Sequence, residues 1–195
     1  MSAKFSQTTA DCLEWNQAMN LIRNLYKDES YKMSLLISFG SFWGLRISDI
    51  LLLKWEQVLS KDELVLVEMK TKKLREIRIN TQLKQHIQDC YERIRPRTLD
   101  EYIFTSQKSS IFSIQRINVM LKEIKKKYNL KVKNFSSHSL RKTFGREIFN
   151  RSGSEAELAL VKLSHLFNHS NPAITRRYLG ISQKELLDTY DTLNF

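Results

Sequence analysis

The chain has 195 residues, 42% of them hydrophobic and 27% charged, with five glycines and two prolines, which is typical of one globular domain and argues against a long disordered linker. Its 32 lysines and arginines outnumber its 21 aspartates and glutamates and give a formal net charge of +11. This excess predicts a polyanionic partner such as nucleic acid, with a merely solvated basic surface as the alternative.

The first part of the chain predicts two helices and a candidate site. Apolar residues at helical spacing predict an amphipathic helix that begins near Thr9 or Leu13, and Met33–Phe42 is apolar around most of its circumference and predicts the most buried helix. The segment GLRISD follows this run directly. A buried guanidinium is costly unless an anion pairs with it, so Arg46 needs a partner, and Asp49 could supply it. A salt bridge between the two without any ligand fits these residues at least as well as a functional site.

Two short runs with β character, Leu64–Met69 and Leu74–Ile79, predict a hairpin. Lys70 lies at the predicted end of the first strand, where the sheet could hold its ammonium at a fixed distance from the core. Lys72 and Lys73 would belong to the turn and point into solvent. Composition alone does not distinguish the three lysines.

The middle of the chain predicts two more helices and a third strand. An apolar face over Thr81–Ile94 indicates a helix that Pro96 ends, and Tyr102–Phe104 is the expected third strand. Ser113 is the expected N-cap of a helix whose inward residues are Ile114, Ile117, Leu121 and Ile124. A basic block follows, usually the mark of a solvated face, but here it agrees in sign with the whole chain. The block comprises Lys122, Lys125, Lys126, Lys127, Lys131 and Lys133.

The segment HSLR opens the next predicted helix. His138 and Arg141 are three residues apart and therefore share a helix face, although such a pair is common by chance. The residues that this helix is expected to bury are Leu140, Phe144 and Ile148. Capping boxes then mark two further helix starts, which are Ser154 with Glu157 and Ser182 with Glu185.

The stretch between these two boxes carries a histidine and a tyrosine around a predicted helix start. Asn171 is the expected cap, the helix should span about Pro172–Leu179, and Gly180 supplies its stop. This leaves His169 in the turn before the helix and Tyr178 near its end. Taken alone, the two residues are better explained as a core tyrosine and a hydrogen-bonded turn histidine, because short motifs match often.

The cellular compartment follows from the cysteines and from the start of the chain. Cys12 and Cys90 are too few and too far apart for a disulfide framework or a zinc site, which favours a reducing compartment. The first residues lack a secretory apolar core, and no stretch approaches the ~18 apolar residues of a membrane span. We therefore expect a cytoplasmic protein without a membrane partner.

Taken together, the motifs supply side chains suited to phosphoryl transfer at a diester. Two guanidiniums can hold the nonbridging oxygens bidentately while negative charge grows on them. A phenol can be the nucleophile and leave a covalent phosphotyrosyl intermediate, and an ammonium or imidazole can protonate the departing hydroxyl. The candidate catalytic residues are Arg46, Lys70, His138, Arg141, His169 and Tyr178.

The order and spacing of GLRISD, the hairpin lysine, HSLR, NHS and the tyrosine closely resemble the tyrosine recombinase (phage integrase) family. The implied roles are phosphate clamps for Arg46 and Arg141, general acid for Lys70, box histidine for His138, second histidine for His169, nucleophile for Tyr178, and support for Asp49. The resemblance implies site-specific DNA strand exchange through a 3′-phosphotyrosyl intermediate, with no metal and no cofactor. A DNA-binding regulator with the same fold and a type IB topoisomerase-like activity are the alternatives.

The same resemblance implies a fold and partners. The fold would be α+β, a mostly helical single domain over 1–195 with a small three-stranded antiparallel sheet. It would lack an N-terminal core-binding domain, either as a minimal recombinase or as a fragment. The expected partner is double-stranded DNA with a specific recombination site. The protein would be a monomer in solution and would form a tetramer on this DNA. Accessory DNA-bending proteins are further candidate partners. The residues expected to contact DNA are Lys72, Lys73, Lys125, Lys126, Lys127 and Lys142.

Two positions depart from the pattern that this family commonly shows. Asn168 stands where a glycine usually precedes the second histidine, and Lys142 stands where a histidine usually follows the box arginine. We expect these two differences to change the local backbone geometry and the hydrogen bonding beside the candidate catalytic residues.

Overall fold

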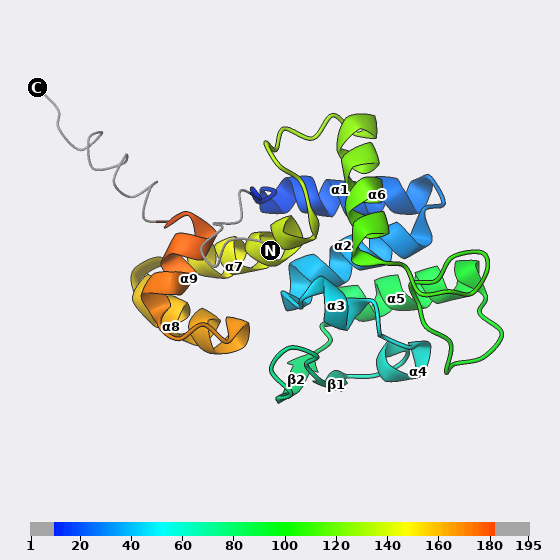
Figure 1. Ribbon diagram of the computed structural model, residues 1–195, viewed down its shortest axis with the longest axis horizontal. Helices are drawn as coiled ribbons and strands as arrows, with labels where there is room; N and C mark the ends of the chain where they lie inside the picture. Colours follow the sequence, from blue (N-terminus) through cyan, green and yellow to red (C-terminus); the bar gives the residue numbers. More distant parts are fainter. Residues whose placement is uncertain (1–9, 182–195) are drawn as a thin grey trace, which may run out of the picture. The chain divides into compact units, whose positions relative to one another are not determined.

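The computed structural model describes residues 10–181 (Figure 1). These residues form two compact units, one over 10–144 and one from Gly145 onward. The division falls inside a helix, α7 (Ser137–Arg151), and not in a linker. The helix predicted to begin at Ser182 lies outside the described residues.

The unit over 10–144 is mostly helical with a small antiparallel hairpin, so the predicted α+β class is confirmed. Its elements in chain order, before the start of α7, are α1 (Trp15–Lys27), α2 (Tyr31–Trp43), α3 (Ile47–Ile50), α4 (Trp55–Val58), β1 (Glu63–Val67), β2 (Leu74–Arg78), α5 (Thr81–Ile94) and α6 (Ile114–Lys127).

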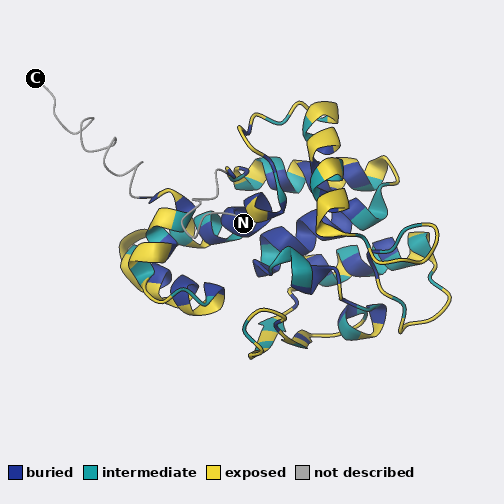
Figure 2. Cartoon of the chain, in the orientation of Figure 1, coloured by how far each residue is buried: buried dark blue, intermediate teal, exposed yellow. Residues whose placement is uncertain are grey.

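Helix α2 lies at the centre of this unit's core, as its apolar run predicts. Ten of its 13 residues are buried, on every side of the helix (Figure 2), and both α1 and α5 pack against it. Helix α1 begins at Trp15, later than predicted. The reason is tertiary, because the Thr143 hydroxyl accepts from the Leu13 N–H at 2.9 Å and donates to the Leu13 carbonyl at 3.2 Å.

The predicted third strand is wrong. Within the described residues the sheet has two strands, β1 and β2, and Tyr102 forms only an isolated bridge with Lys54. The backbone around Tyr102 is paired with the connection before α4, since the Ile103 N–H donates to the Leu53 carbonyl at 3.0 Å. A segment whose backbone groups are paired there cannot extend the hairpin.

Helices α5 and α6 follow their local sequence signals. Helix α5 spans Thr81–Ile94 as predicted, and the Ser113 side chain caps α6 by accepting from the Arg116 N–H at 3.1 Å. Ile114 was expected to face inward but is 40% exposed, because it is the first helical residue. The buried face of α6 comprises Ile117, Leu121 and Ile124.

The unit from Gly145 to Ile181 contains the rest of α7, a short 3₁₀ turn η1 (Gly153–Glu155), α8 (Ala156–Phe167) and α9 (Pro172–Leu179). The predicted capping box at Ser154 is wrong, because Ser154 lies within η1 and Glu155 is the N-cap residue of α8. Ile148 is 38% exposed and not buried as predicted. No helix within 10–181 is both long and apolar enough to cross a membrane.

Gly145 explains how the helices of this second unit approach one another. A Cβ atom at this position would lie 2.7 Å from the Leu179 side chain and 3.0 Å from the Phe167 ring. Real Cβ atoms essentially never come so close. The glycine therefore allows α8 and α9 to pack directly on the backbone of α7.

Candidate active site

Two arginines, the buried Arg141 and the partly buried Arg75, donate hydrogen bonds to the last carbonyls at the C-terminal end of α2. The Arg75 Nη2 donates to the Trp43 carbonyl at 2.8 Å, and the Arg141 Nη1 donates to the Gly44 carbonyl at 2.5 Å. Carbonyls at a helix C-terminus lack intrahelical partners and carry negative partial charge, so they favour cations. The helix end thus offsets part of the cost of burying these guanidiniums.

Gly44 is required at this helix end for two independent reasons. Its φ is +57°, in the left-handed region that L side chains rarely adopt. A Cβ atom there would also lie 2.4 Å from the Phe144 ring. The glycine turns the chain so that Arg46 follows as the N-cap residue of α3.

Arg46 is paired with Glu68, so the predicted pairing with Asp49 is wrong. Glu68 is 1% exposed, and its Oε2 accepts from the Arg46 Nη1 at 2.9 Å while its Oε1 accepts from the Arg75 Nη1 at 3.0 Å. The Thr71 hydroxyl donates to the same Oε2 at 2.8 Å. Burial alone would raise the pKa of Glu68, but the hydrogen bonds from Thr71, Arg75 and Arg46 lower it to about 2. Glu68 is therefore an anion throughout the neutral range.

Asp49 supports the hairpin turn instead. It is 4% exposed, and its Oδ1 accepts from the Met69 N–H at 2.9 Å. Desolvation lowers the pKa of Arg75, and the negative charges of Glu68 and Asp49 oppose this shift. The supporting role expected for Asp49 thus takes the form of a tie between α3 and the turn that carries Lys70.

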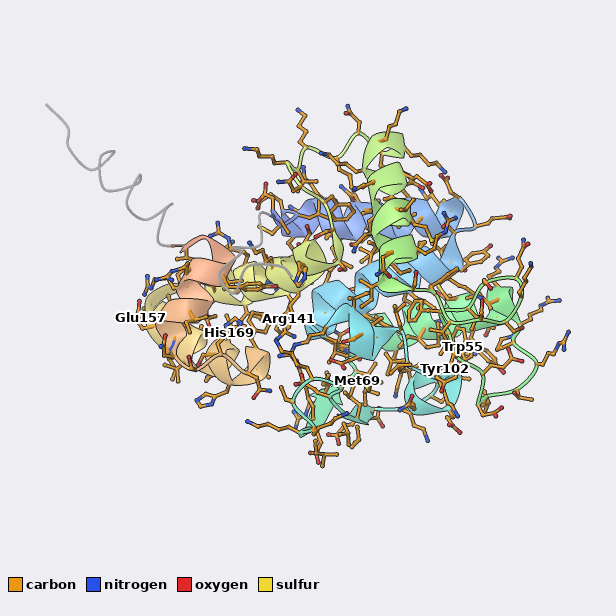
Figure 3. The ribbon with its side chains drawn as sticks, in the orientation of Figure 1. Trp55, Met69, Tyr102, Arg141, Glu157 and His169 are labelled. Carbon is orange, nitrogen blue, oxygen red and sulfur yellow. The ribbon has the colours of Figure 1, made fainter. Side chains whose placement is uncertain are left out.

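Lys70 does not lie at the end of a strand. Strand β1 ends at Val67, and Lys70 is an exposed residue of the turn that follows, next to the labelled Met69 in Figure 3. The turn is closed by backbone bonds, from the Glu68 N–H to the Lys73 carbonyl at 3.0 Å and from the Lys72 N–H to the Glu68 carbonyl at 2.9 Å. The prediction that the sheet itself holds Lys70 is therefore wrong.

His138 and Arg141 lie one turn apart in the first part of α7. Arg141 is 5% exposed, whereas the imidazole of His138 reaches the surface. Desolvation lowers the pKa of His138, and the positive charges of Arg141 and Lys142 lower it further. The neutral imidazole, which can accept a proton, is thus favoured.

The predicted DNA-contacting lysines fall into different classes. Lys142 is 9% exposed, and its ammonium donates to the Ala10 carbonyl at 2.7 Å, which contradicts a DNA contact. The Lys125 ammonium donates to the Lys133 carbonyl at 2.8 Å. The side chains that remain exposed are Lys72 and Lys73 in the hairpin turn and Lys126 and Lys127 on α6, the last of them in an ion pair with Asp28.

His169 and Tyr178 lie together in the second unit, at the two ends of the segment that contains α9, whose bounds are as the capping signals predict. Asn171 accepts from the Ile174 N–H at 3.0 Å and starts α9. The His169 and Tyr178 ring centroids are 5.3 Å apart, and both rings pack edge-on against Phe167. The labelled His169 stands beside this helix in Figure 3.

Thr175 fixes the orientation of the His169 ring, and Asn168 shapes the backbone just before it. The His169 Nδ1 and the fully buried Thr175 hydroxyl form a hydrogen bond of 2.9 Å. Asn168 ends α8 in the left-handed conformation, with φ +52°. Asparagine tolerates this conformation better than most residues, so it can stand where the family commonly has glycine.

Sequence reasoning missed Glu68, Thr71, Arg75 and Thr175. A signal for two of them was present in the alternation of the hairpin strands. Glu68 continues the buried side of β1 and Arg75 lies on the more buried side of β2, as the alternating burial of both strands shows. A carboxylate and a guanidinium that both face inward predict a buried ion pair.

Comparison with known proteins identifies the family. Residues 12–185 match the model of the phage integrase family. The chain belongs to this family. Its members are the tyrosine recombinases, enzymes that cleave and rejoin DNA strands.

Two relatives show how far the similarity extends. The "Probable integrase/recombinase YoeC" of Bacillus subtilis (strain 168) is 38% identical to this chain over 173 residues. The alignment covers 83% of this chain and 90% of the relative. The "Tyrosine recombinase XerC" of Caldanaerobacter subterraneus subsp. tengcongensis is 24% identical over 176 residues, which are 89% of this chain but 47% of the relative. The chain thus spans nearly all of one relative and about half of the other.

Solved structures show the same fold. The XerA recombinase superposes with a TM-score of 0.72 at 21% identity, over 94% of this chain and 66% of that one. XerH bound to a palindromic difH substrate, in a post-cleavage complex, gives 0.69 at 16% identity, over 93% of this chain and 52% of that one. The chain therefore has the same fold as these two recombinases, and it spans between half and two thirds of their length.

Proposed function

We propose that this protein is a site-specific DNA recombinase that cleaves and rejoins strands through a covalent bond between Tyr178 and a 3′-phosphate. The observation that supports this most directly is the arginine cluster at the end of α2 in a chain of this family. Three guanidiniums, those of Arg46, Arg75 and Arg141, accompany two buried carboxylates there, those of Asp49 and Glu68. The surplus of positive charge suits a phosphodiester whose charge grows in the transition state.

The proposed chemistry assigns a role to each candidate catalytic side chain. Arg46 and Arg141 hold the nonbridging oxygens, and the Tyr178 oxygen attacks the phosphorus while the bond to the 5′-oxygen breaks. The Lys70 ammonium gives its proton to that leaving oxygen. The phenol proton passes to a neutral imidazole, a form that the lowered pKa of His138 favours. Attack by a 5′-hydroxyl on the phosphotyrosyl bond reverses these steps and rejoins the strand.

The partners follow from this activity. The substrate is double-stranded DNA with a recombination site, and exposed cations such as Lys126 contribute to its binding through phosphate contacts. We further propose that four copies assemble on paired sites, that the free protein is a monomer, and that it acts in the cytoplasm. Accessory DNA-bending proteins would assist assembly by bringing distant sites together.

Trapping on nicked suicide DNA that carries the native site tests the proposal. Wild-type protein is expected to form a denaturation-resistant adduct, and Tyr178→Phe is expected to bind the same DNA without forming one. Tyr102→Phe is the matched control, because it removes a phenolic hydroxyl from a partly exposed ring in the other unit and should leave the adduct intact. Specific binding by the wild type without any adduct would indicate a DNA-binding regulator instead.

A second assay distinguishes recombination from simple relaxation. Strand exchange between two paired sites is measured beside the relaxation of a supercoiled plasmid that carries one site. Products of exchange between the two sites support the recombinase. Relaxation without any exchanged product would assign the chain a topoisomerase-like activity.

A further inference from the structure

The turn that carries Lys70 is hydrogen-bonded to a buried carboxylate on each side of the lysine. On one side, the Met69 N–H donates to Asp49 Oδ1 at 2.9 Å. On the other, the Thr71 hydroxyl donates to Glu68 Oε2 at 2.8 Å. The lysine therefore lies between two anchored residues, although it is itself exposed and three residues beyond the end of β1.

The carboxylate that holds Thr71 also holds Arg46, a candidate phosphate-binding residue. The Oε2 of Glu68 accepts from Thr71 and also from the Arg46 Nη1 at 2.9 Å. Arg75 fixes the other carboxylate oxygen at 3.0 Å and is itself held by the Trp43 carbonyl at 2.8 Å. One buried carboxylate oxygen thus sets the position of the turn relative to Arg46.

We propose that Thr71 is a positioning residue that places the Lys70 ammonium relative to the phosphate held by Arg46, through the carboxylate of Glu68. This inference rests on the proposed function, since it assigns Thr71 a role only through Lys70 as the leaving-group acid. A general acid must reach its oxygen at hydrogen-bond distance, and a misplacement of about 1 Å can cost roughly 100-fold in rate. A lysine side chain on a free turn would have no such constraint.

The hydroxyl of Thr71 can be removed with little change in shape. Thr71→Val keeps the volume and branching of the side chain but deletes the donor to Glu68. Thr71→Ser keeps the donor and deletes only a methyl group. Thr98→Val is the matched control, because the Thr98 hydroxyl donates to a carboxylate as well, that of Asp100 at 2.5 Å, in an exposed loop of the same unit.

Two DNA substrates separate a positioning role from a structural one. A suicide substrate with sulfur in place of the 5′-bridging oxygen has a leaving group that needs no proton. A defect in the delivery of the Lys70 proton should therefore disappear on the sulfur substrate. A defect in folding or in phosphate binding by Arg46 should remain on both substrates.

The experiment measures single-turnover cleavage of both substrates by the full chain. Thr71→Val is expected to cleave the oxygen substrate about 10 to 100 times more slowly than wild type and the sulfur substrate at nearly the wild-type rate. Thr71→Ser and Thr98→Val should match wild type on both. Glu68→Gln should be slow on both, because Arg46 stabilises the phosphate whichever atom departs.

Two results would overturn the inference while leaving the proposed function intact. One is wild-type cleavage of the oxygen substrate by Thr71→Val, and the other is equal slowing on both substrates. Failure of the proposed function appears elsewhere, as the absence of any adduct with wild-type protein. A Lys70→Ala variant that the sulfur substrate does not rescue would likewise remove the acid role from Lys70 itself.

Discussion

Replacing Glu68 with glutamine tests the ionic centre of the site through protein stability. The change keeps the size of the side chain and one acceptor oxygen but removes the negative charge that Arg46 and Arg75 share. Removing one partner of a buried ion pair is destabilising, because the other charges remain buried. We expect Glu68→Gln to fold but to be less stable than wild type at pH 7.

The magnitude follows from the pKa of Glu68, which falls from an ordinary value of 4.5 to about 2. One pKa unit corresponds to about 1.4 kcal/mol, so the shift sets an upper limit of about 3 kcal/mol. Since the Arg46 side chain is 20% exposed, solvent screening reduces this to about 2 kcal/mol. Because the folded-state pKa is depressed, this stability is present above pH 4.5 and is lost as the pH falls toward 2.

Urea unfolding at several pH values between 7 and 2.5 measures this effect. The three tryptophans all lie in the unit over 10–144, so their fluorescence reports on the unit that contains Glu68. The difference in unfolding free energy between wild type and Glu68→Gln should shrink by about 1.5 kcal/mol over this range, because part of the effect remains until the pH falls below the folded-state pKa of about 2. Glu63→Gln, an exposed carboxylate in the same hairpin, is the control and should show little change. A Glu68→Gln difference that stays constant with pH would refute the reasoning.

Three further variants test other parts of the structure. Lys142→Met should lose about 1 kcal/mol of stability with no change in DNA affinity, and a weakened gel shift would contradict its buried position. Lys126→Met should instead leave stability unchanged and lose about one phosphate contact, which lowers the slope of log binding constant against log salt concentration by about 1. An unchanged slope would show that Lys126 does not contact DNA. Gly44→Ala should cost about 2 to 4 kcal/mol, because it adds a clash with Phe144 to the left-handed φ. Gly153→Ala, also at a positive φ but with nothing within 4 Å, should cost only about 1 kcal/mol, and equal losses would exclude the clash.

Local sequence signals determined the helix that carries Tyr178. Asn171, Pro172 and Gly180 specify the start and end of α9 within a few residues, and the structure has α9 at Pro172–Leu179 as predicted. Caps and turns depend on hydrogen bonds between neighbours three or four residues apart, so the sequence alone contains the information. The contact between the His169 and Tyr178 rings is a tertiary feature, since both rings also pack against Phe167 of α8.

The partners of the buried charges were decided only by the tertiary structure. Arg46 is paired with Glu68, 22 residues away, and not with Asp49 on its own short helix. Arg141 donates to the Gly44 carbonyl across 97 residues, and Lys142 donates to Ala10 across 132. The cost of burying a charge makes some partner necessary, but it does not specify which one, because any carboxylate or carbonyl that the fold brings within reach will serve. The order of the motifs therefore indicated the candidate catalytic side chains, while long-range packing selected the groups that hold them in place.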